Sequence, residues 1–306
     1  MTTTVKVAAA QLSPVFLNKE RTVEKACKAI AEAGENGAAL IVFPEAFISG
    51  YPDWVWLIPN SKGADLNELY VKLVENAVSV PDDSTRRLCK AAKESGINVV
   101  IGMHERNSET SSGSLFNSLL FIDDKGLIAG KHRKLIPTGG ERLIWSQGDG
   151  STLRSYDTSA GKVAGLICWE NFMPLVRNAI YESGAQLLAA PTWDKSPNWI
   201  QSMQHIAREG GLFVISCCMA LKMDDIPESY EFKKLYPEGR DWINVGNSAI
   251  IAPNGQILAG PLEAEEGILY AQIDLDQVIK AKRMFDAVGH YARPDVFTFK
   301  VKNTKG

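Results

Sequence analysis

The feature that most constrains the fold is a regular alternation of short apolar runs with amphipathic helical stretches along the whole chain. Residues 38–43 form a continuous apolar run that ends at Pro44, as is typical of a strand buried on both faces. Leu66, Leu69 and Leu73 then recur at helical spacing. The same plan returns in the second half of the chain, so the sequence predicts an α/β protein.

No linker separates the two halves of this pattern. The polar stretch 105–114 is short enough to be a loop, and no segment rich in proline, glycine or serine divides the chain. We therefore expect residues 1–306 to form a single domain of mixed sheets covered by helices. A two-sheet sandwich is the favoured arrangement, and one wound sheet is the alternative that periodicity alone leaves open.

Composition and charge argue against several classes of function. The chain carries 33 Lys and Arg against 36 Asp and Glu, so no positive surplus is present to neutralise nucleic-acid phosphates. Its apolar runs are far shorter than the roughly 20 residues of a transmembrane helix. The N-terminus lacks the basic and apolar regions of a secretory signal. We expect a soluble cytoplasmic protein that binds neither nucleic acid nor a membrane.

The five cysteines and four histidines outline neither a disulfide framework nor a metal site. The cysteines are odd in number and form no C-x-x-C pair, and the histidines show no H-x-x-x-H spacing. The sequence also lacks a phosphate-binding loop and a dinucleotide-binding glycine motif. We expect no metal and no cofactor, which leaves acid, base and thiol chemistry.

Three reactive side chains stand where predicted strands end, the usual place for function in α/β folds. Glu45 follows an apolar run, Lys134 follows the predicted strand 127–131, and Cys168 ends the predicted strand 162–168. A thiol at this point can be presented on a sharp turn, as in a nucleophile elbow. Taken singly, the three could be a buried hydrophobe, a loop carboxylate and a basic surface residue. Together they suffice for acyl-transfer hydrolysis.

Longer motifs around these residues resemble a known family. The matching segments are Phe43-Pro44-Glu45, His132-Arg133-Lys134-Leu135-Ile136-Pro137-Thr138, Glu141-Arg142 with Trp145 and Gly148-Asp149-Gly150, Cys168-Trp169-Glu170-Asn171, and Gly289-His290-Tyr291-Ala292-Arg293-Pro294-Asp295. On these segments the chain resembles the nitrilase branch of the carbon–nitrogen hydrolase superfamily, from about Val5 to Phe299.

The resemblance implies an αββα two-sheet sandwich and a catalytic triad of Glu45, Lys134 and Cys168. It implies a nitrilase, which converts an organic nitrile into a carboxylic acid and ammonia through thioimidate and acyl-thioester intermediates on the cysteine. It also implies that the protein binds itself, as a homodimer or a longer spiral. We expect the C-terminal segment 285–306 to pack on a neighbouring subunit.

Further site residues follow from the same resemblance. Glu141 is the fourth polar member, which orients Lys134, the substrate or water, and its alternative is a surface ion pair with Arg142. Glu170 and His290 are secondary candidates, and a packed core residue is the alternative for His290. Apart from the resemblance, the aromatic side chains of Tyr51, Trp169 and Trp193 are expected to line the substrate pocket, together with Thr138.

Aromatic residues near the predicted site bear on the choice of substrate. Trp54 and Trp56 either line the pocket with Tyr51 or pack in the core or at a subunit interface. If they line the pocket, we expect aryl or arylaliphatic nitriles to be accepted.

The side chains themselves indicate a mechanism. An unperturbed thiol with a pKa of about 8.5 is mostly protonated at neutral pH. We expect Glu45 to remove the Cys168 proton and the Lys134 cation to favour the thiolate. Three alternatives stay open: an amidase or carbamoyl-amine hydrolase with the same triad, a hydratase that releases the amide, and a non-catalytic scaffold.

Overall fold

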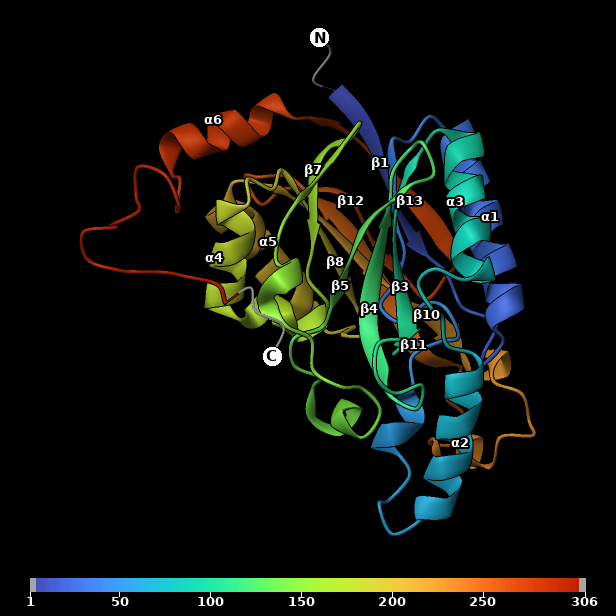
Figure 1. Cartoon of the computed structure of the whole chain (residues 1–306). Helices are drawn as coiled ribbons and strands as arrows, with labels where there is room; N and C mark the ends of the chain where they lie inside the picture. The colour runs from blue at the N-terminus through green and yellow to red at the C-terminus, as the bar shows by residue number, and fades with distance from the viewer. Residues whose placement is uncertain (1–3, 303–306) are drawn as a thin grey trace.

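The structure, a computed structural model, describes residues 4–302, in which thirteen strands form two sheets (Figure 1). The first sheet contains, in spatial order, β13 (Gly267–Asp274), β1 (Thr4–Gln11), β2 (Leu40–Val42), β3 (Asn98–Arg106), β4 (Leu115–Ile122) and β5 (Ile128–Arg133). The second contains β10 (Ala220–Lys222), β11 (Trp242–Ile251), β9 (Phe213–Cys218), β8 (Leu187–Thr192), β7 (Gly161–Gly165) and β6 (Tyr156–Thr158), with β12 (Ile257–Glu263) also paired to β11.

Each sheet has a parallel centre. Strands β1, β2 and β3 are parallel in the first sheet, and β7, β8 and β9 are parallel in the second. Two antiparallel pairings, β3 with β4 and β4 with β5, return β5 to the direction of β2. The carboxyl ends of β2 and β5 therefore lie at the same edge of the first sheet.

Helices cover the outer face of each sheet and complete four layers (Figure 1). Helices α1 (Lys19–Glu35) and α3 (Asp83–Ser95) pack on the first sheet, and α4 (Pro174–Glu182) and α5 (Pro197–Gly210) pack on the second. Helix α2 (Gly63–Glu75) extends beyond one end of the sheets, and α6 (Asp276–Met284) lies near the other end.

The inner faces of the two sheets pack against each other. Val7 and Val42 of the first sheet share one buried core with Ala189 and Ile215 of the second, and all four are fully buried. The expected αββα two-sheet sandwich is confirmed, and the single wound sheet is excluded. Each half of the chain builds its own parallel centre, and only face-to-face packing buries both inner surfaces.

One predicted loop was expected to begin at residue 105, and this boundary is wrong. The polar stretch 105–114 was expected to lie outside the strands, but β3 continues through Arg106. Glu105 is fully buried there, where Lys131 and Arg133 of β5 neutralise it and Ser118 of β4 donates a hydrogen bond. A buried carboxylate is compatible with a strand when neighbouring strands supply its cations.

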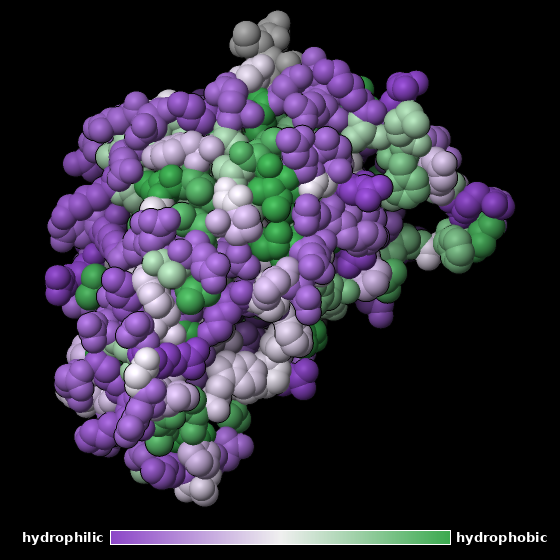
Figure 2. Space-filling view, turned by 180° about the vertical axis from the view of Figure 1, so that it is seen from behind, coloured by the Kyte–Doolittle hydropathy of each residue, from purple (hydrophilic) through white to green (hydrophobic). Residues whose placement is uncertain are grey.

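The chain beyond α6 leaves the body of the protein and returns to it (Figure 1). Residues 285–302 contain no helix or strand, and the described chain ends beside Gly150. Figure 2 shows this segment standing out at the right edge with hydrophobic residues on it. Its packing on a neighbouring subunit stays a prediction, and its residues 303–306 lie outside the described range. Within residues 4–302, no helix combines the length and apolar character needed to cross a bilayer.

Candidate active site

Loops at the carboxyl ends of strands carry the three residues that the sequence singles out. Glu45 follows β2, Lys134 follows β5 on the same sheet, and Cys168 follows β7 on the facing sheet. All three side chains are buried, and Cys168 interacts electrostatically with both of the others. The sandwich therefore brings together groups that are far apart along the chain.

Cys168 stands on a strained turn. Its backbone φ is +52°, in the left-handed region that residues other than glycine rarely adopt. Strand β7 ends at Gly165, short of the expected boundary at residue 168, because the chain bends into the 3-10 turn Cys168–Phe172. Asn171 Nδ2 closes this turn by donating to the carbonyl oxygens of Leu166 and Cys168, at 2.9 and 2.8 Å. This is the strand-to-turn geometry that the sequence predicts.

Lys134 lies between two buried carboxylates. Its Nζ is 2.8 Å from Glu45 Oε1 and 2.8 Å from Glu141 Oε2. Asn117 Nδ2 donates to the same Glu45 oxygen at 2.7 Å. The structure does not have the surface ion pair between Glu141 and Arg142, because Glu141 is buried on Lys134 and the Arg142 Nε donates to a backbone carbonyl.

Burial and the two nearby carboxylates favour the neutral form of the Cys168 thiol. Burial opposes the charge of Lys134, but the adjacent Glu45 and Glu141 carboxylates keep its pKa above the ordinary value. Burial raises the pKa of Cys168 to about 12, and the negative charge of Glu45 adds to the effect. The Lys134 cation lowers the pKa of Cys168, the direction that the sequence analysis expects, but burial and the two carboxylates raise this pKa by more than the cation lowers it.

Glu45 differs from its neighbours in having an unused oxygen. Its Oε1 accepts from Lys134 and Asn117, whereas its Oε2 is buried and has no hydrogen-bond partner in the described chain. Burial raises the pKa of Glu45 more than the Lys134 cation lowers it. A carboxylate with a raised pKa and a free oxygen is suited to accept a proton.

Thr192, at the end of β8, is a site residue that the sequence analysis missed. Its hydroxyl donates to Cys168 Sγ at 3.2 Å, while its oxygen accepts from the backbone N–H of Asp194 at 2.9 Å. Because that N–H occupies a lone pair, the hydroxyl hydrogen is free to point at the sulfur. The rule that selected Glu45 and Lys134, a polar residue where a strand ends, would also have selected Thr192.

A cavity of about 360 Å³ opens above Cys168. Its lining includes all four predicted pocket residues and five others: Tyr51, Trp56, Thr138, Glu141, Cys168, Trp169, Trp193, Asp194 and Ser196. Tyr51 and Trp193 stack face to face, with ring centroids 4.5 Å apart. Four of the nine lining residues are thus aromatic, Thr138 and Ser196 add small polar groups, and Glu141 and Asp194 add carboxyl groups.

Hydrogen bonds connect this wall to the charged cluster. The Tyr51 hydroxyl donates to Glu141 Oε1 at 2.7 Å and accepts from Trp56 Nε1 at 3.3 Å. Trp56 is therefore a pocket residue, whereas Trp54 is fully buried in the helix-side core against Phe16. The two tryptophans that the sequence treats alike have different roles.

The two secondary candidates lie outside the cavity lining. Glu170 is buried within the Cys168 turn and accepts a hydrogen bond from the backbone, and His290 is exposed on the C-terminal segment against Tyr291. Among residues 4–302, no group of three His, Cys, Asp or Glu side chains is arranged to hold a metal ion.

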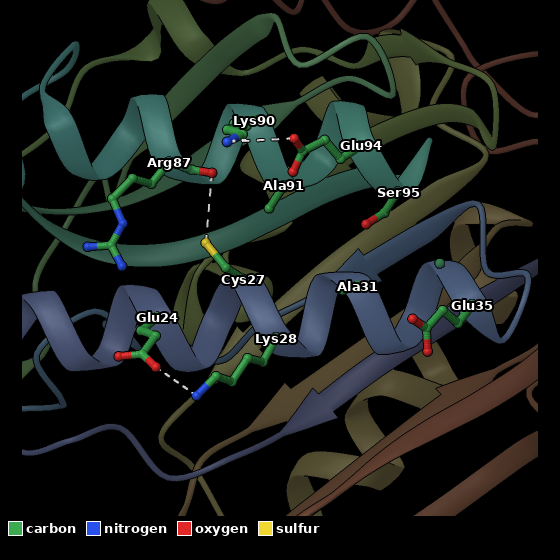
Figure 3. A pocket seen from close by; sticks show the side chains of 11 residues that line it. Glu24, Cys27, Lys28, Ala31, Glu35, Arg87, Lys90, Ala91, Glu94 and Ser95 are labelled. Atoms are coloured by element: carbon green, nitrogen blue, oxygen red, sulfur yellow. Dashed lines mark hydrogen bonds and ion pairs between the residues drawn. The ribbon is translucent and has the colours of Figure 1, made fainter.

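A larger groove of about 770 Å³ lies elsewhere, between α1 and α3 (Figure 3). Its cysteine, Cys27, is half-buried and contacts the carbonyl oxygen of Arg87 at 3.7 Å (Figure 3). Burial raises the pKa of Cys27, and the two lysine–carboxylate pairs of the groove, Lys28 with Glu24 and Lys90 with Glu94, are exposed to solvent, unlike the buried cluster at Cys168 (Figure 3). The acid, base and thiol combination occurs at Cys168.

A family comparison agrees with this geometry, since the model described as carbon-nitrogen hydrolase matches residues 6–283. The chain belongs to the carbon–nitrogen hydrolase family. It is 43% identical over 303 residues to nitrilase 1 of Arabidopsis thaliana, covering 96% of this chain and 86% of that protein. It is 40% identical over 309 residues to a bifunctional nitrilase/nitrile hydratase of Nicotiana tabacum, covering 99% and 87%.

Solved structures of the family share the fold. A carbon–nitrogen hydrolase from Helicobacter pylori superposes with a TM-score of 0.73 over 97% of both chains, at 21% identity. The resemblance read from the sequence motifs is therefore confirmed, and this hydrolase acts on carbon–nitrogen bonds other than peptide bonds.

Proposed function

We propose that this carbon–nitrogen hydrolase is a nitrilase, which converts an organic nitrile and two water molecules into a carboxylic acid and ammonia. The observation that carries the proposal is the buried Lys134–Glu45 pair beside the Cys168 thiol, beneath an apolar cavity. Identity of about 40% with curated nitrilases over nearly the whole chain supports it.

In the first step, transfer of the Cys168 proton and attack of its sulfur on the nitrile carbon take place together. Glu45 Oε2 accepts the Cys168 proton while Sγ bonds to the nitrile carbon, and the nitrile nitrogen then takes that proton to give a thioimidate. Ionising Cys168 in advance would place a further negative charge beside Glu45 in a buried site. A concerted transfer avoids that charge, and the hydrogen bond from the Thr192 hydroxyl stabilises the negative charge that develops on the sulfur.

Two waters complete the reaction. Glu45 takes a proton from the first water as its oxygen adds to the thioimidate carbon, and returns this proton to nitrogen, which becomes an NH2 group. Glu45 then moves the proton of the new hydroxyl group to the same nitrogen, so that the carbon–nitrogen bond breaks, ammonia leaves and the thioester carbonyl forms. The second water attacks the resulting thioester in the same way and releases the acid and the thiol. The Lys134 ammonium and the Trp169 backbone N–H stabilise the tetrahedral species, and one such donor contributes about 3–4 kcal/mol.

Partition of the first tetrahedral species decides the product. Loss of ammonia leads to the acid, whereas breaking the carbon–sulfur bond releases the amide. The relative from Nicotiana tabacum is described as both nitrilase and nitrile hydratase, so the amide is a second product to be measured. An amidase with the same residues would attack a carbonyl carbon instead.

The cavity favours aryl and arylaliphatic nitriles. Aromatic rings of Tyr51, Trp56, Trp169 and Trp193 face its interior and match an apolar aromatic substrate. Conversion of small aliphatic nitriles alone would contradict this assignment.

Self-association is the proposed partner interaction. Tyr291, Val296 and Phe297 are exposed on the projecting segment 285–302, and a second copy of the chain would cover them. Replacing Val296 and Phe297 with serine should lower the mass measured by sedimentation, and an unchanged mass would contradict the proposal. A cytoplasmic location is also proposed, because all five cysteines are free thiols.

One panel tests the catalytic proposal. The protein is incubated with aromatic, arylacetic and aliphatic nitriles and with the matching amides, and ammonia, acid and amide are measured together. We expect acid and ammonia from nitriles with the wild-type chain and no turnover with Cys168→Ala. Hydrolysis of the amides without the nitriles would identify an amidase, and no turnover of either would identify a scaffold.

A further inference from the structure

Glu170 is a buried carboxylate that does not face the cavity. It lies in the turn Cys168–Phe172, and about 1% of its surface is exposed. Burial favours the neutral form, but His132 and two backbone N–H groups hold the pKa of Glu170 below its ordinary value. The side chain is therefore an anion that interacts with protein groups only.

Each oxygen of Glu170 holds the backbone next to a different active-site residue. Oε1 accepts from the N–H of Leu135, the residue after Lys134, at 2.7 Å. Oε2 accepts from the N–H of Ile167, the residue before Cys168, at 2.8 Å. One carboxylate thus connects the loop after β5 on the first sheet to the turn after β7 on the second.

His132 completes this connection from β5. Its Nε2 lies 3.2 and 3.1 Å from the two Glu170 oxygens, and its Nδ1 lies 2.9 Å from Thr152 Oγ1. Because the ionised carboxylate only accepts, Nε2 carries a hydrogen. The partners of Glu170 therefore lie on the two segments that carry Lys134 and Cys168.

The Cys168 turn needs such support. A left-handed backbone at a residue other than glycine costs about 1–3 kcal/mol and persists only where its surroundings impose it. The bond from Ile167 to Glu170 holds the residue before Cys168, and the Asn171 side chain holds the carbonyl of Cys168 itself. Loss of the first bond would let the turn relax and move Sγ.

We propose that Glu170 is a positioning residue that sets the separation of the Cys168 sulfur and the Lys134 ammonium by holding Ile167 and Leu135 across the two sheets. This rests on the proposed function, in which those two groups act on one substrate carbon. A displacement of about 1 Å can reduce a rate about 100-fold. Glu170 thereby affects turnover without contacting the substrate.

Glu170→Gln is the variant that tests this assignment. An amide has one acceptor oxygen, so glutamine satisfies one backbone N–H and turns an N–H toward the other. We expect kcat for the best nitrile to fall about 100-fold while KM changes less than threefold. Iodoacetamide should alkylate Cys168 more slowly, with a pH profile shifted from that of the wild type, as read by peptide mass spectrometry.

Asp123→Ala is the matched control. Asp123 accepts hydrogen bonds from the backbone N–H groups of Lys125 and Leu127 in the β4–β5 hairpin. This hairpin precedes β5, whereas Lys134 follows it. Its loss should lower the melting temperature but leave kcat and Cys168 alkylation within twofold of the wild type. Should Glu170→Gln fail to fold, Glu170→Asp, which keeps two acceptor oxygens, is expected to lose part of kcat.

The outcomes separate the two proposals. Wild-type kcat and wild-type alkylation in a folded Glu170 variant would overturn the positioning role, as would equal losses in Asp123→Ala. Absence of nitrile turnover in the wild type would instead overturn the proposed function, and alkylation of Cys168 would still report on Glu170.

Discussion

Glu45 and Glu170 are two buried carboxylates beside the same thiol, yet their surroundings give them opposite properties. Glu45 keeps one oxygen without a partner, and burial raises its pKa. Both oxygens of Glu170 accept hydrogen bonds, and its pKa is lowered. Burial is the largest influence in both cases, so the difference arises from the neighbours: the Glu141 charge raises the pKa of Glu45, whereas His132 and two backbone N–H groups lower that of Glu170.

This contrast separates a group that exchanges a proton from a group that holds the backbone. A carboxylate with unfilled hydrogen-bonding capacity is easily protonated, whereas one that accepts from several donors stays ionised and fixed. The same side chain can thus serve as a base or as a structural anchor within one site.

Substitution of Glu45 should have the largest effect on turnover. Glu45→Gln removes the only proposed proton acceptor, so kcat for the best nitrile should fall about 10⁴-fold. Steady-state kinetics would measure this fall alongside that of Glu170→Gln. A smaller loss at position 45 than at position 170 would reverse the assigned roles.

Removing the cation between the carboxylates should have the next largest effect. Lys134→Ala leaves Glu45 and Glu141 buried without their shared partner, so the free energy of unfolding should fall by about 3–5 kcal/mol at pH 8. We expect kcat to fall about 10³-fold as well. Urea unfolding should show a smaller stability loss at lower pH, as Glu45, whose pKa burial raises, becomes neutral. A loss that does not depend on pH would contradict the ion cluster.

Thr192 tests whether the sulfur needs a donor in addition to the base. Thr192→Val keeps the shape but removes the hydroxyl bonded to Cys168 Sγ, so kcat and the rate of Cys168 alkylation should each fall about 10-fold. Thr192→Ser should retain most of both rates. Equal behaviour of the valine and serine variants would show that only packing matters at this position.

His104 extends the comparison to a buried base whose two ring nitrogens both form hydrogen bonds. Its Nδ1 accepts from Trp145 Nε1 at 3.0 Å, and its Nε2 donates to the Gly50 carbonyl at 2.8 Å. Burial lowers the pKa of His104 to about 4, so the unfolded chain binds a proton at a higher pH than the folded protein does.

The resulting loss of stability appears on acidification. His104 should not change the free energy of unfolding above about pH 6.5, and should lower it by up to about 3 kcal/mol as the pH falls toward 4. Urea unfolding of the wild type and His104→Gln across this range measures the difference. A variant with the same acid sensitivity as the wild type would exclude His104 as its source.

Much of the site was accessible from one rule, that polar residues at the ends of buried strands carry function. The rule selects Glu45, Lys134 and Cys168, and would have selected Thr192 had it been applied to β8. It does not distinguish Trp54 from Trp56, because both lie in one short turn and only the tertiary structure decides which ring meets the core.

The sequence by itself determined the order of strands and helices and the residue types available for chemistry, because hydrophobic periodicity indicates which face of each element is buried. Only the tertiary structure decided that the strands form two sheets and that burial raises the pKa of the Cys168 thiol. It also decided that both oxygens of Glu170 accept hydrogen bonds, whereas one oxygen of Glu45 does not. These properties depend on groups far apart in the chain, whose burial and charges act together only after the sheets have packed.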